Sequence, residues 1–456
     1  MGTMPGDLRF PDGFLWGAAT AGHQVEGNNI HSNWWQWEQL GLVDDGTTSG
    51  RAVDYWNRWP EDHALVEDLG FGVFRLGIEW ARIEPAQGRF DEVALAHYVE
   101  MIADLSRRGV KVCLTLNHWV VPQWFADNGD WLAKDAVAHW ERFIRFVVPS
   151  LAPYVDLWIT LNEPSVPYLV GNLIGYHPPM RRSPRSAHRV FVTLLRAHTV
   201  AYHAIHELVP EAPDGGPTQV GVATAYQFIE PYHTSGPARS LEGALCRLVR
   251  YCSFGAWDRA LQTGRYRSLT GRVCTIDGLA GSYDFVGVNY YTRVSVSLAP
   301  STLANVKSGE FAAPPGVPVT EMGWQVYPQG FRAILNHVAA TFDAPIYVTE
   351  NGCCDSGDAD RRSYIVRHLA AMHAAIGDGA DVRGYMHWSF TDNFEWREGF
   401  AKRFGMVRVD HDDPGLIRRP RDSAAMLSDI AAANAITSEI ASRYAPGVST
   451  SSDTTE

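Results

Sequence analysis

The chain has 456 residues, of which 46% are hydrophobic and 20% charged, a composition with ample material for a globular core. Its formal net charge of −12 argues against a nucleic-acid-binding or anionic-membrane surface, because both need a concentrated basic face. No apolar run approaches the ~20 residues of a membrane span, and we expect no secretory signal, since residues 1–10 lack a basic segment followed by an apolar one.

Eight short apolar runs recur along the chain and are predicted to be strands buried on both faces. They cover residues 14–20, 72–80, 110–119, 155–164, 220–228, 283–291, 345–352 and 382–390. Amphipathic helices are predicted between several of them. Their apolar stripes cover residues 95–105 after a cap at Asp91, residues 137–147 after Asp135, and residues 190–208 before Pro210.

Eight strands that alternate with helices, without a linker, predict parallel βα units closed into a single (β/α)8 TIM barrel. A doubly wound open sheet is the alternative, but no Gly-x-Gly-x-x-Gly follows the first strand. Three intervals, 171–186, 232–241 and 299–318, are then predicted to be long βα loops. We expect one catalytic domain over residues 1–446 and a disordered tail over residues 447–456.

The six cysteines indicate reduced thiols rather than a disulfide framework. Cys353 and Cys354 are adjacent, and Cys113 and Cys274 lie in or near apolar, strand-like runs. This pattern favours a cytoplasmic protein. No Cys-x-x-Cys spacing indicates a metal site, and we expect no metal.

Polar residues gather at the strand ends, where catalytic groups of a (β/α)8 barrel are found. Two strands carry a carboxylate in nearly the same context, Thr-Leu-Asn-Glu-Pro at 160–164 and Val-Thr-Glu-Asn-Gly at 348–352. A single acidic residue after a strand is by default a helix cap or a surface charge. A pair facing one cavity is what glycosidic-bond cleavage requires, because one carboxyl protonates the departing oxygen while the other attacks the anomeric carbon or activates water.

Over roughly residues 8–425 the sequence resembles glycoside hydrolase family 1, the retaining β-glucosidase and β-galactosidase family. Beyond the two carboxylate motifs, the resemblance rests on further motifs in the family's order. These are Phe-Leu-Trp-Gly-Ala-Ala-Thr-Ala-Gly-His-Gln-Val-Glu-Gly at 14–27, Gly-Val-Asn-Tyr-Tyr-Thr-Arg at 287–293, Glu-Met-Gly-Trp at 321–324, His-Trp-Ser-Phe-Thr-Asp-Asn-Phe-Glu-Trp at 387–396 and Lys-Arg-Phe-Gly at 402–405.

Carried over residue by residue, the resemblance implies catalytic roles for five residues. Glu163 would be the acid/base and Glu350 the nucleophile. Arg75 and Tyr291 would hold Glu350 ionised and aimed. Asn162 would bind the sugar 2-hydroxyl, an interaction that strengthens in the transition state.

The resemblance implies substrate-binding roles for nine more residues. Trp388 would form the stacking floor, Phe404 a wall near C6 and Trp324 a platform for the aglycone. The other six would bind hydroxyl groups or complete the polar shell: Gln24, His118, Trp119, Asn289, Glu395 and Trp396.

Structural roles compete with several of these assignments. Without the motifs, Trp119, Trp396 and Phe404 would be core aromatic residues, His118 a core histidine and Arg75 an ion-pair partner. Four further polar residues at strand ends are assigned to structure alone, namely Glu26, Glu79, Asp392 and Asn393.

The implied function is an exo-acting retaining β-glycosidase that acts on small-molecule β-glycosides or oligosaccharides, without cofactor or metal. The two carboxyl groups would lie about 5–5.5 Å apart, as retention requires. A Gly-Arg-Gly-Pro-Ser-x-Trp stretch common in the family is missing after residue 27, and Asn117 and His387 are closer to the branch with archaeal β-glycosidases. The choice among glucose, galactose and fucose therefore stays open.

Two other functions remain open at this point. A transglycosylase would use the same two glutamates and pass the sugar to an alcohol or sugar acceptor. A non-catalytic glycan-binding barrel would keep the fold, but such barrels typically lose a catalytic Glu, and both are present here.

Overall fold

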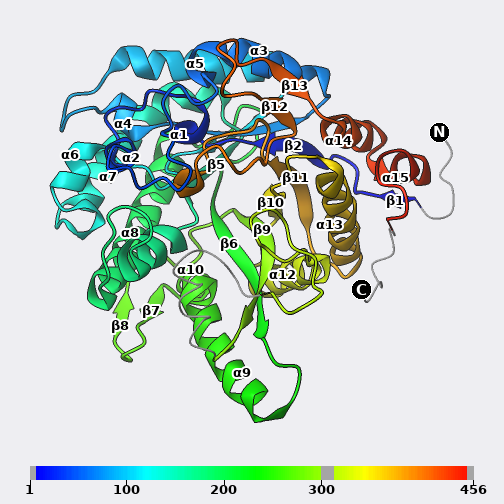
Figure 1. Cartoon of the computed structure of the whole chain (residues 1–456). Helices are drawn as coiled ribbons and strands as arrows, with labels where there is room; N and C mark the ends of the chain where they lie inside the picture. Colours follow the sequence, from blue (N-terminus) through cyan, green and yellow to red (C-terminus); the bar gives the residue numbers. More distant parts are fainter. Residues whose placement is uncertain (1–6, 299–312, 449–456) are drawn as a thin grey trace.

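The computed structural model, which describes residues 7–298 and 313–448, is organised around a closed barrel of eight parallel strands (Figure 1). The barrel strands follow chain order, and the last pairs with the first. They are β2 (Leu15–Ala19), β3 (Val73–Gly77), β4 (Lys111–Thr115), β5 (Leu157–Asn162), β6 (Gln219–Pro231), β9 (Phe285–Val296), β10 (Ile346–Asn351) and β11 (Val382–Trp388). All eight predicted strands and the (β/α)8 fold are confirmed.

Two barrel strands are longer than predicted. Strands β6 and β9 continue past the barrel as a paired ribbon, in which Phe228 lies opposite Arg293 and Pro231 opposite Val296. Beyond Tyr291 the chain alternates polar and apolar residues, as a strand with two different faces does. The strands were predicted from continuous apolar runs, so the predicted strands stopped before this alternating segment.

The three predicted helices are confirmed as α5 (Glu92–Arg107), α7 (Ala136–Leu151) and α8 (Pro184–Leu208). The carboxylate of Asp91 caps α5 by accepting hydrogen bonds from the backbone N–H groups of Val93 and Ala94. Helix α8 begins before its predicted apolar stripe, because Ser183 caps it and Pro184 fits its first turn.

Other helices connect the strands or complete the C-terminal region, and none of the described helices is both long and apolar enough to cross a membrane. They are α1 (Gly22–Val25), α2 (Asn33–Glu38), α3 (Tyr55–Asp68), α4 (Trp80–Ile83), α6 (Gln123–Asp127), α10 (Ala256–Thr263), α12 (Pro328–Thr341), α13 (Ala359–Gly377), α14 (Asp422–Ala433) and α15 (Ser438–Tyr444). Short strand pairs lie outside the barrel: β1 (Leu8–Arg9) with β14 (Ala435–Ile436), β7 (Arg265–Arg267) with β8 (Val273–Thr275), and β12 (Val407–Val409) with β13 (Arg418–Pro420).

Two of the predicted long loops are partly helical, which corrects the prediction. The interval 171–186 contains the end of a π-helix, Val166–Ile174, and the start of α8. The interval 232–241 contains the start of α9 (Gly236–Arg250), which projects from the barrel (Figure 1). Its sequence carries an apolar stripe of Leu241, Leu245, Leu248 and Val249, but of its residues only Glu242 and Cys246 are buried. Residues 299–312 of the third loop and 449–456 of the predicted tail lie outside the described residues.

The barrel interior is apolar at the amino ends of the strands and polar at their carboxyl ends. Val73 and Cys113 belong to an interior cluster with Ile159, Phe285 and Met386. Two residues further along the same strands, on the same face, lie Arg75 and Thr115. The apolar layers fill the barrel and leave the buried polar groups at the end where the βα loops begin.

Candidate active site

Two buried glutamates lie at the carboxyl ends of β5 and β10. Glu163 follows the last residue of β5, and Glu350 is the penultimate residue of β10. Their exposed fractions are 7% and 4%. Buried carboxylates normally require partners, and the bonds that these two make differ.

A chain of hydrogen bonds connects the two glutamates through Arg75 and two asparagines. The Nη1 of Arg75 donates to Glu350 Oε1 at 2.6 Å, and its Nη2 donates to Asn162 Oδ1 at 2.7 Å. Asn289 Nδ2 donates both to Asn162 Oδ1, at 3.0 Å, and to Glu163 Oε1, at 2.9 Å. The two glutamates, Arg75 and the two asparagines therefore form one hydrogen-bonded network.

The surroundings of the two glutamates affect their pKa values differently. Burial raises the pKa of Glu350, but the Arg75 guanidinium and a 2.6 Å hydrogen bond from the Tyr291 hydroxyl oppose that rise. Burial and the negative charge of Glu350 raise the pKa of Glu163 to about 8. Glu350 is thus equipped to act as the anion of the pair and Glu163 to hold the proton.

A third buried carboxyl, that of Glu395, lies beside Gln24. Gln24 Nε2 donates to Glu395 Oε2 at 3.3 Å and also to the carbonyl of Phe394 at 2.9 Å. Burial raises the pKa of Glu395 well above its usual range, and the neighbouring carboxylates Glu398 and Glu350 raise it further. This carboxyl can therefore donate a hydrogen bond as well as accept one.

Aromatic rings join these polar groups in two sets. The first centres on His118, whose ring stacks on Trp388 at 5.9 Å and on Trp396 at 5.7 Å, while Trp119 lies 4.6 Å from Trp396. His118 is also hydrogen-bonded to Asn162 at 2.9 Å. Burial and the Arg75 charge lower the pKa of His118 well below its usual value, so the ring is neutral.

The second set centres on Tyr291, which connects it to Glu350. The Tyr291 ring lies 5.4 Å from Trp324 and 6.1 Å from Phe404, and Trp324 and Phe404 are 6.1 Å apart. Through these contacts and bonds, the structure brings all fourteen predicted site residues together at one end of the barrel.

Four of the assembled side chains hold buried polar atoms that have no hydrogen-bond partner within the described part of the chain. These atoms are Gln24 Oε1, His118 Nδ1, Trp119 Nε1 and Trp324 Nε1. Buried polar atoms are nearly always hydrogen-bonded in folded proteins. Such atoms beside flat rings suit a ligand with many hydroxyl groups.

Three site residues have a strained backbone. Glu163, Trp119 and Trp396 have φ values of +44°, +70° and +53°, although each carries a bulky side chain. Non-glycine residues in this region typically cost on the order of 1–3 kcal/mol, and such strain clusters at functional sites.

Sequence analysis missed three residues that hold the site. Thr349 Oγ1 donates to Asn289 Oδ1 at 2.6 Å, and Thr115 Oγ1 accepts from Arg75 Nε at 3.1 Å. Glu398 contributes a charge that, after burial, further raises the pKa of Glu395. Thr349 stands inside the Val-Thr-Glu-Asn-Gly motif, which could have identified it; the other two carry no such signal.

The polar residues that were assigned to structure make protein contacts. Glu26 pairs with Arg82 at 2.7 Å, and Glu79 accepts from the His23 backbone N–H at 2.7 Å. The carboxylate of Asp392 accepts two hydrogen bonds from Arg421 at 3.0 Å. Asn393 is bound to Gln24, Oδ1 accepting at 3.1 Å, and to Ser389 Oγ, Nδ2 donating at 3.1 Å.

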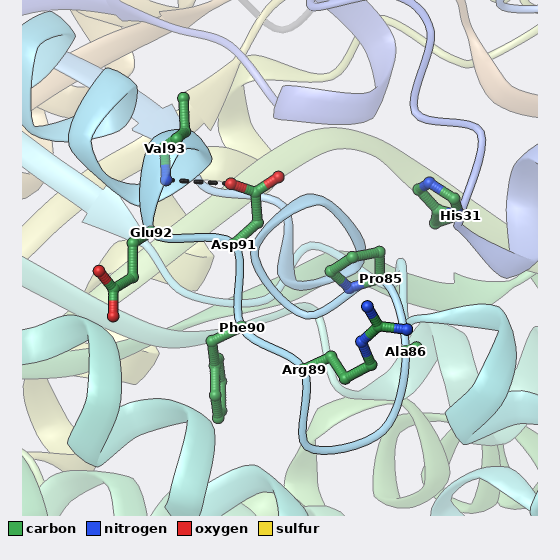
Figure 2. A pocket seen from close by; sticks show the side chains of 8 residues that line it. All are labelled: His31, Pro85, Ala86, Arg89, Phe90, Asp91, Glu92 and Val93. Atoms are coloured by element: carbon green, nitrogen blue, oxygen red, sulfur yellow. Dashed lines mark hydrogen bonds between the residues drawn. The ribbon is translucent and has the colours of Figure 1, made fainter.

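A separate pocket of about 630 Å³ lies along the segment from α4 to the first turn of α5 (Figure 2). Figure 2 shows Asp91 with its capping bond to Val93, close to Glu92, and His31 across from Arg89. None of the residues that line this pocket belongs to the predicted site. Within the described residues, no group of three or more His, Cys, Asp or Glu side chains is placed to hold a metal ion.

Comparisons with known proteins agree with this geometry. The model of the family described as Glycosyl hydrolase family 1 matches residues 7–436. Beta-glucosidase A of Thermotoga maritima is 32% identical over 88% of this chain and 94% of its own length. Beta-galactosidase of Saccharolobus solfataricus is 31% identical, over 94% of this chain and 96% of its own.

Solved structures are similar over the same extent. The beta-glycosidase from Pyrococcus horikoshii superposes with a TM-score of 0.85 at 36% identity, covering 96% of this chain and 98% of that chain. The beta-glucosidase from Thermotoga maritima in complex with glucoimidazole gives a TM-score of 0.83 at 30% identity, covering 94% of this chain and 99% of that chain.

Proposed function

Since the chain belongs to glycosyl hydrolase family 1 and is a glycoside hydrolase, we propose that it is an exo-acting retaining β-glycosidase. It removes terminal non-reducing β-D-glucosyl residues. Terminal galactosyl and fucosyl residues are further candidate substrates. The observation that carries the proposal is the buried glutamate pair, in which Arg75 and Tyr291 stabilise one anion while burial and that anion keep the other carboxyl protonated.

In the first half-reaction, Glu350 attacks the anomeric carbon and the glycosidic bond breaks. The departing oxygen takes the proton of Glu163, whose pKa of about 8 keeps that proton available at neutral pH. The product is a glycosyl ester on Glu350. In this proposal Asn162 binds the 2-hydroxyl, which is supported by the bonds that connect its amide to both glutamates through Arg75 and Asn289.

In the second half-reaction, the ester removes the charge on Glu350, so the pKa of Glu163 falls and its carboxylate becomes a base. Glu163 takes a proton from water, the hydroxide oxygen bonds to the anomeric carbon, and the ester bond breaks. The Glu350 carboxylate is regenerated, and the sugar keeps its β configuration.

The remaining predicted residues form the sugar pocket in this proposal. Gln24 and Glu395 bind the hydroxyls at one end, and His118, Trp119, Asn289 and Trp396 complete the polar wall. Trp388 is the stacking floor, Phe404 the wall near C6 and Trp324 the aglycone platform. All six cysteines are free thiols, which supports the further proposal of a cytoplasmic enzyme.

Retention is the first prediction. Proton NMR of a fresh β-glucoside digest, recorded before mutarotation, is expected to show β-glucose first, because two displacements restore the starting configuration. If an alcohol is added, any transfer product should also be the β-glycoside. Early release of α-glucose would contradict the double displacement.

A second prediction concerns pH. The kcat/KM for a β-glucoside with a poor leaving group should decline above about pH 8, since Glu163 must be protonated in the free enzyme and its pKa is about 8. With Glu163→Gln and a dinitrophenyl glucoside, whose leaving group needs no proton, the glycosylation rate should lose this alkaline limb. An unchanged limb in the variant would assign the titration to another group.

A third prediction concerns sugars phosphorylated on O6. Three cations stand near Glu395 in sequence, but each is bound elsewhere: Arg397 to Asp44, Lys402 to the Glu321 carbonyl and Arg403 to Asp392. An ionised Glu395 would repel a phosphate on O6. Burial and the neighbouring carboxylates raise the pKa of Glu395, so this side chain is not the main source of repulsion. The main penalty for binding the 6-phosphate is then the burial of a dianion that has no cationic partner.

An unpartnered buried ion typically costs several kcal/mol, and 1.4 kcal/mol corresponds to tenfold. We therefore expect kcat/KM for nitrophenyl β-glucoside 6-phosphate to be about 10²-fold or more below that for nitrophenyl β-glucoside. Comparable values would mean that Glu395 does not face C6.

A further inference from the structure

Residues 236–275 carry a charge of the opposite sign to that of the whole chain. They contain seven arginines and two carboxylates, whereas the chain has a formal net charge of −12. The segment forms α9, a π-helical turn (Tyr251–Gly255), α10 and the β7–β8 hairpin. In Figure 1 both α9 and the hairpin lie at the lower edge of the view, outside the barrel. A net charge does not report such a local concentration of cations.

The positive charges of this segment are exposed and uncompensated. Its seven arginines are all exposed: Arg239, Arg247, Arg250, Arg259, Arg265, Arg267 and Arg272. Its two carboxylates are buried and bound to other groups, since Glu242 accepts from the His233 backbone N–H at 2.9 Å and Asp258 from the Tyr226 hydroxyl at 2.9 Å. Across residues 7–298 and 313–448, no carboxylate forms an ion pair with any of the seven arginines.

The hairpin presents its arginines on one face. Along β7 the side chains alternate, so Tyr266 is buried while Arg265 and Arg267 are exposed. The Tyr266 ring lies 4.5 Å from the Phe191 ring of α8, which defines the inward side of the hairpin. On β8, Val273 lies opposite Arg267 and therefore shares its outward face.

The hairpin lies beside the end of α9. The hydroxyl of Tyr251, the residue directly after α9, donates to the Arg267 carbonyl. Burial raises the pKa of Tyr251, while the charges of Arg259 and Arg267 oppose that rise, so both guanidinium groups lie near this hydroxyl. Arg247 and Arg250 precede Tyr251 by about one helical turn or less. The cations of α9, α10 and β7 thus form one basic face.

Large apolar side chains are exposed beside these cations. Leu241 and Leu248 are seven residues apart on α9, hence on one side of the helix, and are 62% and 43% exposed. Leu269 at the hairpin tip and Val273 on β8 are 64% and 51% exposed. Exposed apolar residues that gather in one region mark an interaction surface.

The combination of cations and aliphatic side chains restricts the partner. A nucleic acid would engage the arginines through its phosphates but would leave the leucines without an apolar environment. A second copy packed α9 against α9 would bring arginines of like charge together. An anionic lipid surface suits both kinds of side chain, because its headgroups attract the arginines and its acyl boundary accepts the leucines.

We propose that the basic face, made of the seven arginines with Leu241, Leu248, Leu269 and Val273, docks the protein on bilayers rich in anionic lipid. The net charge argued against such a surface because a concentrated basic face is needed, and residues 236–275 supply one. The segment lies in the interface and does not span the bilayer. None of these residues belongs to the predicted site, so the inference does not rest on the proposed β-glycosidase function.

Co-sedimentation of the whole chain with vesicles measures the docking. We expect binding to vesicles of mixed phosphatidylglycerol and phosphatidylcholine, and none to vesicles of phosphatidylcholine alone. Added salt should weaken the binding, because it screens exposed charges. A triple variant should lower the partition coefficient about 10²-fold, since one cation near such a surface contributes about fivefold. Its changes are Arg247→Gln, Arg267→Gln and Arg272→Gln.

Matched variants separate this face from charge in general. Arg89→Gln, Arg367→Gln and Arg419→Gln remove the same charge from exposed sites on other elements and should together keep binding within about twofold. Leu241→Ser with Leu248→Ser should lower the partition coefficient about tenfold or more. Leu40→Ser, at a position 64% exposed elsewhere, should not. Every variant should keep the wild-type Tm, since the changed side chains are exposed.

Four results would overturn membrane docking. The first is no binding to the anionic vesicles, and the second is equal binding to phosphatidylcholine alone or equal loss in both triple variants. The third is binding of a single-stranded oligonucleotide without vesicle binding, which would assign the face to nucleic acid. The fourth is self-association that Leu248→Ser abolishes, again without vesicle binding, which would assign it to a second copy. Each result leaves the proposed hydrolytic function untouched, because that function is assayed on nitrophenyl β-glucoside without vesicles.

Discussion

Replacement of Glu163 by alanine is expected to lower kcat/KM for cellobiose by about 10²–10⁴-fold, while glycosylation by 2,4-dinitrophenyl β-glucoside is nearly unchanged. The reason is that the glucose leaving group of cellobiose must gain a proton as it departs, whereas dinitrophenolate leaves unaided. Pre-steady-state release of dinitrophenol measures the first step alone. Added azide should then speed deglycosylation of the variant and yield β-glucosyl azide, because it attacks the ester without needing a base.

The Glu163→Gln variant is the control for folding. The pKa of Glu163 is about 8 in the folded protein and near 4.5 when unperturbed, so the folded state binds more protons and loses stability as pH rises between those values. The neutral Gln should therefore leave the Tm at pH 7 unchanged or raise it. Equal losses on both substrates, with no azide rescue, would remove Glu163 from the acid/base role.

Replacement of Glu350 by alanine is expected to reduce kcat on every β-glycoside by about 10⁵–10⁶-fold, the scale of loss when a covalent nucleophile is removed. Azide in the vacated space would attack from the opposite face to the leaving group. With dinitrophenyl β-glucoside the product should be α-glucosyl azide, the opposite anomer from that expected of Glu163→Ala. Formation of the β-azide would place the nucleophile elsewhere.

Two matched variants accompany this experiment. Tyr291→Phe keeps the ring beside Trp324 but removes the 2.6 Å bond to Glu350, so its loss should be smaller and confined to steps in which Glu350 attacks or leaves. Glu207→Ala removes a surface partner of Arg145, outside the catalytic network, and should retain turnover of dinitrophenyl β-glucoside. A loss for Tyr291→Phe as large as for Glu350→Ala would indicate general damage to the site.

The sequence predicted the barrel because its strands are buried on both faces and therefore continuous in apolar character. Helices with one buried face, such as α5, were found for the corresponding reason. Helix α9 was missed although Leu241, Leu245, Leu248 and Val249 recur at helical spacing, because Gly236 and Pro237 at its start are also typical of a loop. The ends of β6 and β9 were missed because they form a two-faced ribbon.

The site residues were predicted from motifs, and the structure assembles all of them, but their electrostatics depend on distant partners. The pKa of Glu395 is raised by burial and then by Glu398, and the sequence gives no reason to single out Glu398. The bonds of Arg75 to Thr115 and Asn162 join three strands whose pairing is known only after folding.

The most direct test of the central claim is to trap the glycosyl ester. With 2,4-dinitrophenyl 2-deoxy-2-fluoro-β-glucoside, the fluorine destabilises the charged transition states of both steps and the good leaving group speeds the first, so the ester should accumulate. Mass spectrometry of peptic peptides is expected to place one fluoroglucosyl group on Glu350. A label on another residue, or turnover without any covalent adduct, would contradict the assignment of Glu350 as the nucleophile.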